Sequence, residues 1–298
     1  MLIRYGYELE FKCVAPTTCI FMLDIRPEER QHAVIPDEMD ARSLSDGSAI
    51  DVSDTYNDQF GNVCRRVLAP AGLFVVSATG LFRASGAPDR QSWGASLQKP
   101  EELPTDVIGF LVGSRYCETD KLSDFAWARF SGRSDGWATV SAICDYVHDT
   151  IRFDYALARS TRTAMEALEE KVGVCRDFTH AAIALCRCLN IPARNCTGYL
   201  GDIGVPPDPA AMDFSAWFEA YIDGSWWTFD PRHNRPRIGR IVIARGRDAA
   251  DTPIVMSFGQ HALRRFEVTT EEASITEPIE MDIRSAPSRR QLARAQTY

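Results

Sequence analysis

The sequence predicts an α+β protein, in which a β-rich first third precedes a helical segment and an antiparallel sheet. Apolar and polar residues alternate with period two in the first third, most clearly over residues 3–11. Beyond about residue 104 the spacing of the apolar residues becomes helical, as over residues 137–148. Farther on, Asp223-Gly224 separates two alternating runs, which is a strong signal for a two-residue β-hairpin.

The predicted strands of the first third are short and follow one another closely. They lie at residues 3–11, 19–25, 49–52, 63–68 and 73–83. Several short strands at this spacing favour two antiparallel sheets packed face to face. A segment rich in Gly, Pro, Ser and Gln follows and is typical of a linker. We therefore expect a β-sandwich-like N-terminal domain over residues 1–104.

The second domain is expected over residues 105–275, with helices first and strands afterwards. The predicted helices are residues 137–148, a short helix capped by Ser160 or Thr161 and ended by Gly173, and a run from Cys175 to about Leu189. The predicted strands are residues 193–200, 214–222 and 225–230. The last segment, residues 276–298, is predicted to be a flexible tail.

Composition excludes several classes of function. The chain has 298 residues and a formal net charge of −8, and it lacks a basic stripe with interleaved aromatic residues, so no nucleic-acid partner is expected. It also lacks an apolar run long enough to span a bilayer, so no membrane partner is expected. The N-terminus enters strand-like alternation directly, without the pattern of a secretory signal.

The nine cysteines are irregularly spaced and include no CxxC pair. This pattern predicts buried, reduced thiols in a cytoplasmic protein and argues against a zinc site. Acidic residues do not cluster with the spacing of a calcium loop. We therefore expect no metal and no cofactor.

Cys175 is the candidate nucleophile because it stands at the predicted start of a helix, just after Gly173. The helix dipole and the free N–H groups of a first turn favour a thiolate, and glycine lets the chain turn sharply before it. A thiol nucleophile needs a base nearby and a third group to orient that base. The predicted hairpin would place a residue near 215 opposite one near 230, so these two positions are where partners are expected.

Five segments together resemble the transglutaminase-like superfamily: residues 173–180, 191–194, 198–199, 216–221 and 226–231. The resemblance spans roughly residues 135–235. It implies a papain-like core with a Cys–His–Asp triad, in which a thiolate attacks an amide carbonyl of a peptide or protein substrate. A thioester forms and is passed to water or to an amine. The first third is similar to the β-rich region that precedes this core in bacterial cysteine peptidases of the superfamily.

Carried over by position, the resemblance makes Cys175 the nucleophile and Asp230 the orienting carboxylate. The family histidine, which precedes Ala-Trp, is replaced here by Ser215. Serine cannot accept a proton from a thiol at neutral pH, and loss of a triad member costs about 10³- to 10⁶-fold in rate. His233 is the nearest histidine in sequence and is a possible substitute base, although a loop histidine without a catalytic role is the simpler interpretation.

Two aromatic side chains near the candidate site have other expected roles. Trp217 follows the Ser215 position and is a candidate substrate-binding residue, against the alternative that it belongs to the core. His180 lies five residues after Cys175, about 140° around the helix, so it is expected to point away from the thiol and into the core.

Two functions from different classes remain open. The first is an enzyme, a cysteine peptidase, amidase or acyl transferase that acts on peptide or glutamine-type amides through a Cys175 thioester. The second is a pseudoenzyme that binds peptides or a partner protein without turnover. The presence of Cys175 and Asp230 favours the first, and Ser215 favours the second, unless Ser215 is an introduced change.

Overall fold

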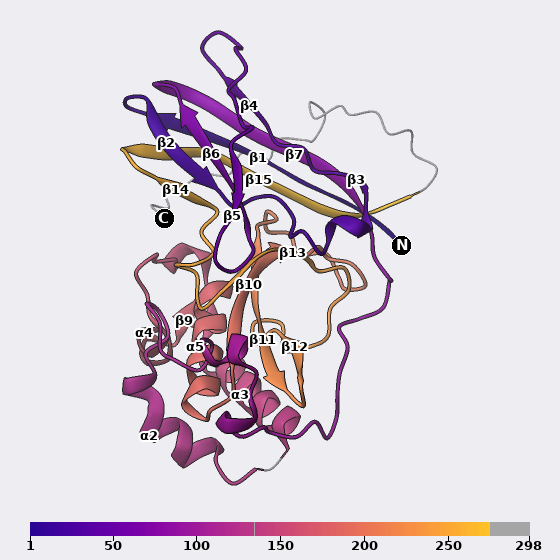
Figure 1. Ribbon diagram of the computed structural model, residues 1–298, viewed down its shortest axis with the longest axis vertical. Coiled ribbons are helices and arrows are strands. Elements are labelled where there is room, and N and C mark those ends of the chain that lie inside the picture. The colour runs from indigo at the N-terminus through magenta and orange to yellow at the C-terminus, as the bar shows by residue number, and fades with distance from the viewer. Residues whose placement is uncertain (134, 275–298) are drawn as a thin grey trace.

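The computed structural model describes residues 1–133 and 135–274. It has a β-rich region at one end and a region of helices packed on another antiparallel sheet at the other (Figure 1). The predicted α+β class and the β-rich first third are therefore confirmed. The predicted tail, residues 276–298, lies outside the described residues.

Two antiparallel sheets form the β-rich region. In the first, the order is β15-β1-β7-β3, and β4 also pairs with β7; the bounds are β1 Leu2–Cys13, β3 Ala33–Ile35, β4 Asp40–Ser43, β7 Gly72–Arg83 and β15 His261–Ala273. In the second, the order is β14-β2-β6-β5, with β2 Thr17–Phe21, β5 Thr55–Asn57, β6 Val63–Ala69 and β14 Val255–Ser257. The inward side chains of both sheets share one apolar core, which is why period-two alternation predicted this region correctly.

Sequence and structure differ at several places in this region, since β3, β4 and β5 were not predicted. No strand forms at residues 49–52, where Asp51 accepts a hydrogen bond from the Ser53 N–H at 2.8 Å, a local bond that competes with strand pairing. In addition, β14 and β15 fall within the range expected for the second domain, yet they pair with β2 and β1. The division at residue 104 stays a prediction, and the last two strands are joined to the β-rich region.

The other region contains the sheet β12-β11-β10-β13. Its strands are β10 Ala193–Tyr199, β11 Ser215–Ile222, β12 Ser225–Phe229 and β13 Ile241–Gly246. The predicted hairpin is confirmed, since Ile222 pairs with Ser225. Asp223 and Gly224 have φ values of 52° and 76°, the left-handed backbone that a tight two-residue hairpin requires.

Helix α5 is the centre of this region (Figure 1). It spans Cys175–Cys188, and every residue in it except Arg176 is buried. It contacts β10 and β11 on one side and three helices on the other, α2 Thr119–Phe130, α3 Gly136–Thr150 and α4 Ala164–Glu170. The remaining short elements are η1 Arg30–His32, η2 Pro100–Glu102, α1 Thr105–Ile108, β8 Arg152–Phe153, η3 Tyr155–Leu157 and β9 Val172–Gly173.

The cap of α4 is Thr163 rather than Ser160 or Thr161. The Thr163 hydroxyl accepts from the Glu166 N–H, and the Glu166 carboxylate accepts from the Thr163 N–H. This reciprocal pair satisfies two N–H groups at once, which a cap two or three residues earlier would not do. Gly173 does not end the helix either, because Lys171 takes the left-handed conformation there, with φ of 55°.

Aromatic side chains join the two regions. Tyr199 in β10 packs edge-on against Tyr5 in β1, with ring centroids 5.1 Å apart. Phe214 contacts Tyr199 at 5.2 Å, Tyr7 at 6.3 Å and Phe266 in β15 at 5.8 Å. Because Phe214 immediately precedes β11, the β-rich region helps to fix where that strand begins. Within the described ranges, no helix is long and apolar enough to cross a membrane.

Candidate active site

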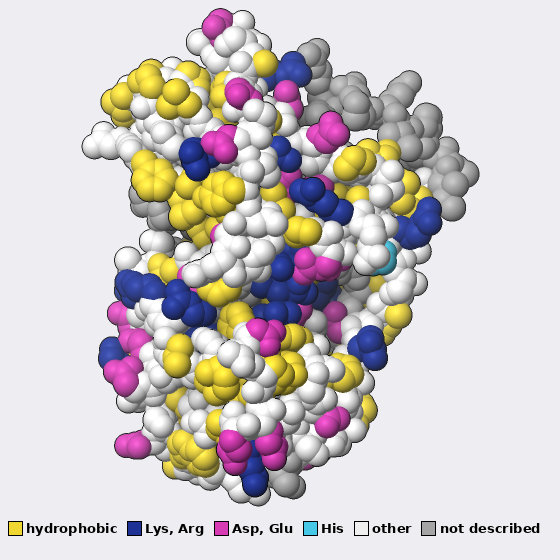
Figure 2. Space-filling view, in the orientation of Figure 1, with side chains coloured by type: hydrophobic (Ala, Val, Ile, Leu, Met, Phe, Trp, Pro, Cys, Tyr) yellow, Lys and Arg dark blue, Asp and Glu magenta, His cyan; other side chains and the backbone are white. Residues whose placement is uncertain are grey.

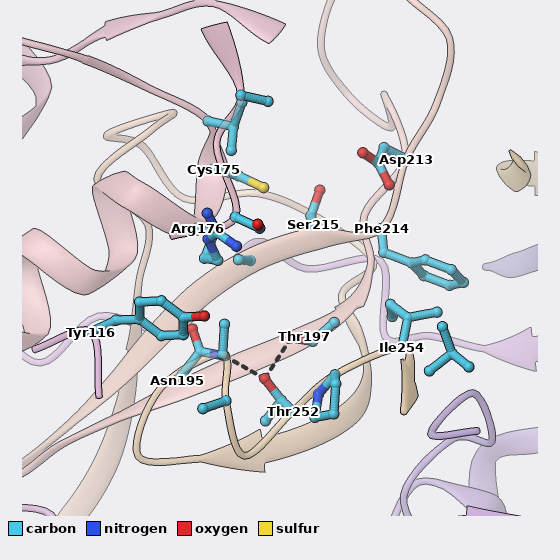
Figure 3. A pocket seen from close by; sticks show the side chains of 18 of the residues that line it. Tyr116, Cys175, Arg176, Asn195, Thr197, Asp213, Phe214, Ser215, Thr252 and Ile254 are labelled. Carbon is cyan, nitrogen blue, oxygen red and sulfur yellow. Dashed lines mark hydrogen bonds between the residues drawn. The ribbon is translucent and has the colours of Figure 1, made fainter. Parts of the chain in front are cut away.

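A cavity of about 620 Å³ lies where the start of α5 meets the β-rich region. Cys175 and Ser215 line it from the helical region, and residues 254–257 and His261 line it from the β14–β15 side. Figure 3 shows the Cys175 sulfur and the Ser215 hydroxyl turned toward the same part of this space. The structure therefore brings together the predicted nucleophile and the residue at the family base position.

Cys175 is held at its place by a buried carboxylate. Asp177 has no exposed surface, and it accepts hydrogen bonds from the Val174 N–H at 2.9 Å and from Arg162 at 3.1 Å. A Cβ at Gly173 would lie 2.6 Å from the Asp177 Cβ, so only glycine lets the chain pass this close. The turn before α5 is thus fixed by packing and charge together.

The thiol itself is strongly desolvated. Burial raises the pKa of Cys175 to about 11, although the Arg232 guanidinium and a hydrogen bond from the Ala216 backbone act in the opposite direction. The expected preference for a thiolate at the helix start is outweighed by this burial. At neutral pH the side chain is a protonated thiol, so nucleophilic attack requires a group that removes the proton.

Asp230 lies directly after β12 and is buried. Its carboxylate accepts from the His233 ring at 2.9 Å and from Arg240 at 2.9 Å. Burial opposes the charged form, but Arg240 and His233 together hold the pKa of Asp230 well below its usual range. Arg240 also binds Asp89 at 3.0 Å, so the carboxylate belongs to a buried cluster of opposite charges.

The predicted site residues therefore form two separate pairs. Cys175 and Ser215 line the cavity, whereas Asp230 and His233 bind each other and are not among the lining residues. Trp217 has only 1 % of its surface exposed, and the Arg240 guanidinium covers its ring at 4.9 Å. It does not line the cavity either, so its indole is placed in the interior rather than against bound substrate.

His180 lies in the core, as its position in the helix predicts. It is fully buried, its Nε2 accepts from the Ala249 N–H at 3.1 Å, and its ring stacks on Tyr116 at 5.0 Å. Burial holds its pKa well below the usual value, so it is a neutral hydrogen-bond acceptor. This histidine supports the loop after β13 and does not face the thiol.

Sequence reasoning missed Asp213, which lines the cavity two residues before Ser215. Its Oδ2 accepts a hydrogen bond from the Tyr155 hydroxyl at 3.3 Å. Burial raises the pKa of Asp213 to about 6, opposed by the Phe214 backbone, by Tyr155 and by Arg232. A signal was present, because the alternation of β11 extended backwards by one step puts residues 213 and 215 on one face. The predicted strand begins at residue 214, so Asp213 stands one residue outside it.

Within residues 1–133 and 135–274, no three His, Cys, Asp or Glu side chains are placed to hold a metal ion. The residues that line the cavity include Cys175, Ser215 and Asp213, which carry a thiol, a hydroxyl and a carboxylate. These groups can carry out proton transfer and covalent chemistry at a carbonyl carbon.

Comparison with known proteins agrees with the fold. The family model of the transglutaminase-like superfamily matches residues 128–231. A crystal structure of a "putative cysteine protease" from Cytophaga hutchinsonii is 30% identical, covers 93% of this chain and 92% of its own, and superposes with a TM-score of 0.77. An uncharacterized protein of Mycobacterium leprae is 30% identical over 96 residues, which are 30% of this chain and 33% of that protein. The chain thus belongs to the transglutaminase-like superfamily.

Proposed function

We propose that the protein is a thiol-dependent hydrolase or acyl transferase that acts on peptide or glutamine-type amides through Cys175. The observation that carries this proposal is the position of the thiol at the first turn of α5, facing a cavity of about 620 Å³. The N–H groups of a first helical turn have no acceptor within the helix, so they can bind the oxygen of a carbonyl under attack. The name of the Cytophaga relative favours the same chemistry.

In the proposed reaction, the Cys175 sulfur bonds to the amide carbon as its proton leaves. The carbonyl electron pair moves to oxygen, returns as the C–N bond breaks, and the released amine takes up a proton. The remaining thioester is then attacked by water, which gives hydrolysis, or by a second amine, which gives transfer. Asp230 and His233 are proposed to support the site only from a distance, because they are held by Arg240 and by each other.

The second candidate is a non-catalytic protein that binds peptides or a partner in the same cavity. Two observations favour it: Ser215 replaces the family base, and burial raises the pKa of Cys175 to about 11. For either function the cytoplasm is the proposed compartment, because all nine cysteines are buried as free thiols, a state that a reducing environment maintains.

The test is turnover by the parent protein and by Cys175→Ala. We expect the parent to release ammonia from a glutamine peptide or to cleave a peptide anilide, and to form a hydroxamate when hydroxylamine is added. Cys175→Ala should lose both activities. Cys188→Ala, at the other end of α5, is the matched control and should keep them. Saturable peptide binding by the parent without any product would instead establish the second candidate.

A further inference from the structure

We propose that Asp213 takes over the role of the missing histidine and accepts the Cys175 proton during acylation. This inference rests on the proposed function, since it assigns the base for that reaction. It adds a catalytic residue that the Cys–His–Asp pattern does not contain. Tyr155 is assigned as a positioning residue, because it acts on the reaction only through Asp213.

Asp213 lies on the same cavity as the thiol. Asp213, Ser215 and Cys175 all line the cavity, and in the view of Figure 3 the Ser215 hydroxyl lies between the Cys175 sulfur and the Asp213 carboxylate. Phe214, which also lines the cavity, packs against aromatic rings of β1, β10 and β15 and so fixes the chain on either side of it. Residues 213 and 215 are two apart and therefore point to the same side of an extended chain. Asp213 is thus offset by two residues from the family base and shares its face of the chain.

Charged and polar groups surround the Asp213 carboxylate. Tyr155 from η3 donates a hydrogen bond to it at 3.3 Å, Cys175 faces it from α5, and Arg232 from the segment after β12 contributes a positive charge. The Arg232 guanidinium is held over the Phe153 ring at 3.8 Å. Asp230, by contrast, has its oxygens occupied by Arg240 and His233. Of the two carboxylates, only Asp213 is free to exchange a proton with the cavity.

The acidities of Asp213 and Cys175 suit a proton transfer between them. Burial raises the pKa of Asp213 to about 6, so it is mostly ionised at neutral pH and can still accept a proton. Burial also raises the pKa of Cys175 to about 11, so a free thiolate would be scarce. Proton transfer must therefore accompany attack on the carbonyl rather than precede it, which is general base catalysis.

Asp213 carries the transferred proton in both halves of the proposed reaction. As the S–C bond forms, the thiol proton passes to Asp213, directly or through one water, and the carbonyl oxygen becomes an oxyanion. As the C–N bond breaks, the Asp213 carboxylic acid returns that proton to the leaving nitrogen and becomes a carboxylate again. In the second half, Asp213 takes a proton from the attacking water and gives it to the departing sulfur. No oxidant, metal or other co-reactant is consumed.

His261 is the competing candidate for the base. His261 at the start of β15 also lines the cavity, from the side of Met256 and Ser257. The charge of Asp213 is among the main influences on the Cys175 thiol. His261→Gln is therefore the competing variant in the experiment, and a loss of activity there would point to a different base.

The experiment compares Asp213→Asn with the parent and with Asp223→Asn, an exposed carboxylate at the hairpin tip where asparagine fits the backbone. On a peptide anilide, we expect kcat of Asp213→Asn to fall about 10²- to 10⁴-fold, the range for removal of a general base. On a p-nitrophenyl ester, whose leaving group needs no proton, the loss should be smaller. Alkylation of Cys175 by iodoacetamide should become faster, because the negative charge that raises the thiol pKa has been removed.

Slower amide turnover together with faster alkylation is the expected signature of a base, because amide turnover needs the proton acceptor whereas alkylation needs only the thiolate. Equal losses in both assays, or parent-like amide turnover in Asp213→Asn, would overturn the assignment while leaving the proposed function intact. Loss of turnover in His261→Gln with full activity in Asp213→Asn would do the same. If the parent itself has no activity on the anilide or the ester, the proposed function falls, and the assignment of the base falls with it.

Discussion

At the scale of single residues, the protein shifts the pKa values of two aspartates in opposite directions. Asp230 lies against Arg240 and His233, which hold its pKa well below the usual range despite burial. Asp213 has burial as its main influence, which raises its pKa to about 6. Two carboxyl groups whose environments push their pKa values apart take different roles, one as a permanent charge and the other as a proton acceptor. The cavity contains the second of these.

Tyr155→Phe tests how the proton acceptor is tuned. The Tyr155 hydroxyl stabilises the Asp213 carboxylate, so its removal should raise the pKa of Asp213 above about 6. Activity requires the ionised carboxylate and therefore rises as pH passes upward through that pKa. The acidic limb of kcat/KM should move to higher pH in Tyr155→Phe, while the rates at alkaline pH converge with those of the parent. Tyr146→Phe in α3 is the control, and an unchanged limb in Tyr155→Phe would contradict the link.

Ser215→His tests whether a histidine at the family position can work beside Asp213. An imidazole with a pKa near its ordinary value would supply a second base next to the thiol. Placed in the Asp213→Asn background, it should restore amide turnover by on the order of 10-fold or more, since a base contributes at least that factor. The readout is hydrolysis of a peptide anilide by the single and double variants. Failure of the double variant to exceed Asp213→Asn would mean that residue 215 cannot reach the sulfur productively.

At the scale of elements, the position of the thiol depends on the start of α5. Asp177 binds the Val174 N–H and is paired with Arg162, whose side chain is itself almost completely buried. Glu170, which is more exposed, bonds to the same guanidinium at 2.9 Å. The ion pair between Asp177 and Arg162 thus holds the start of α5 against the segment before α4, and Glu170 links the same guanidinium to α4 itself.

Asp177→Asn should therefore destabilise the fold rather than change the chemistry directly. It leaves the buried Arg162 charge with a weaker partner, and breaking a buried ion pair costs about 3–5 kcal/mol. Urea unfolding of Asp177→Asn should show a loss of at least about 3 kcal/mol. Glu169→Gln on the exposed side of α4 should stay within about 0.5 kcal/mol of the parent. A loss below about 1 kcal/mol for Asp177→Asn would mean that Arg162 is satisfied by its other partners.

The sequence predicts elements well where one periodicity dominates. The helix from Cys175, the hairpin at Asp223-Gly224 and the long strand at residues 73–83 are all present in the structure. The pairing of β15 with β1 was not predictable, because nothing local in either strand encodes a partner about 250 to 270 residues away in the chain. The charge cluster around Asp230 was missed for the same reason, since Arg240 and Asp89 approach it only in the folded chain.

At the scale of the whole molecule, the cavity belongs to both regions. Its walls come from α5 and the start of β11 on one side, and from the residues around β14 on the other. Figure 2 shows Lys and Arg side chains gathered across the middle of the molecule, in the hollow between the two ends. Because ligand sites favour such junctions, the β-rich region is part of the site rather than an appendage. Sequence analysis predicted both regions but placed every candidate residue in only one of them.

Phe214→Ala tests this dependence. Its ring packs against Tyr7, Tyr199 and Phe266, and removing a buried phenylalanine side chain costs about 3–5 kcal/mol. If these contacts also aim Asp213 at the thiol, kcat for amides should fall more in Phe214→Ala than in a variant that loses similar stability elsewhere. Phe74→Ala, deep in the β-rich core, is that matched variant, and both are assayed well below their unfolding temperatures. Equal kcat values at equal loss of stability would show that the β-rich region only supports the fold, and a selective loss in Phe214→Ala would show that it positions the base.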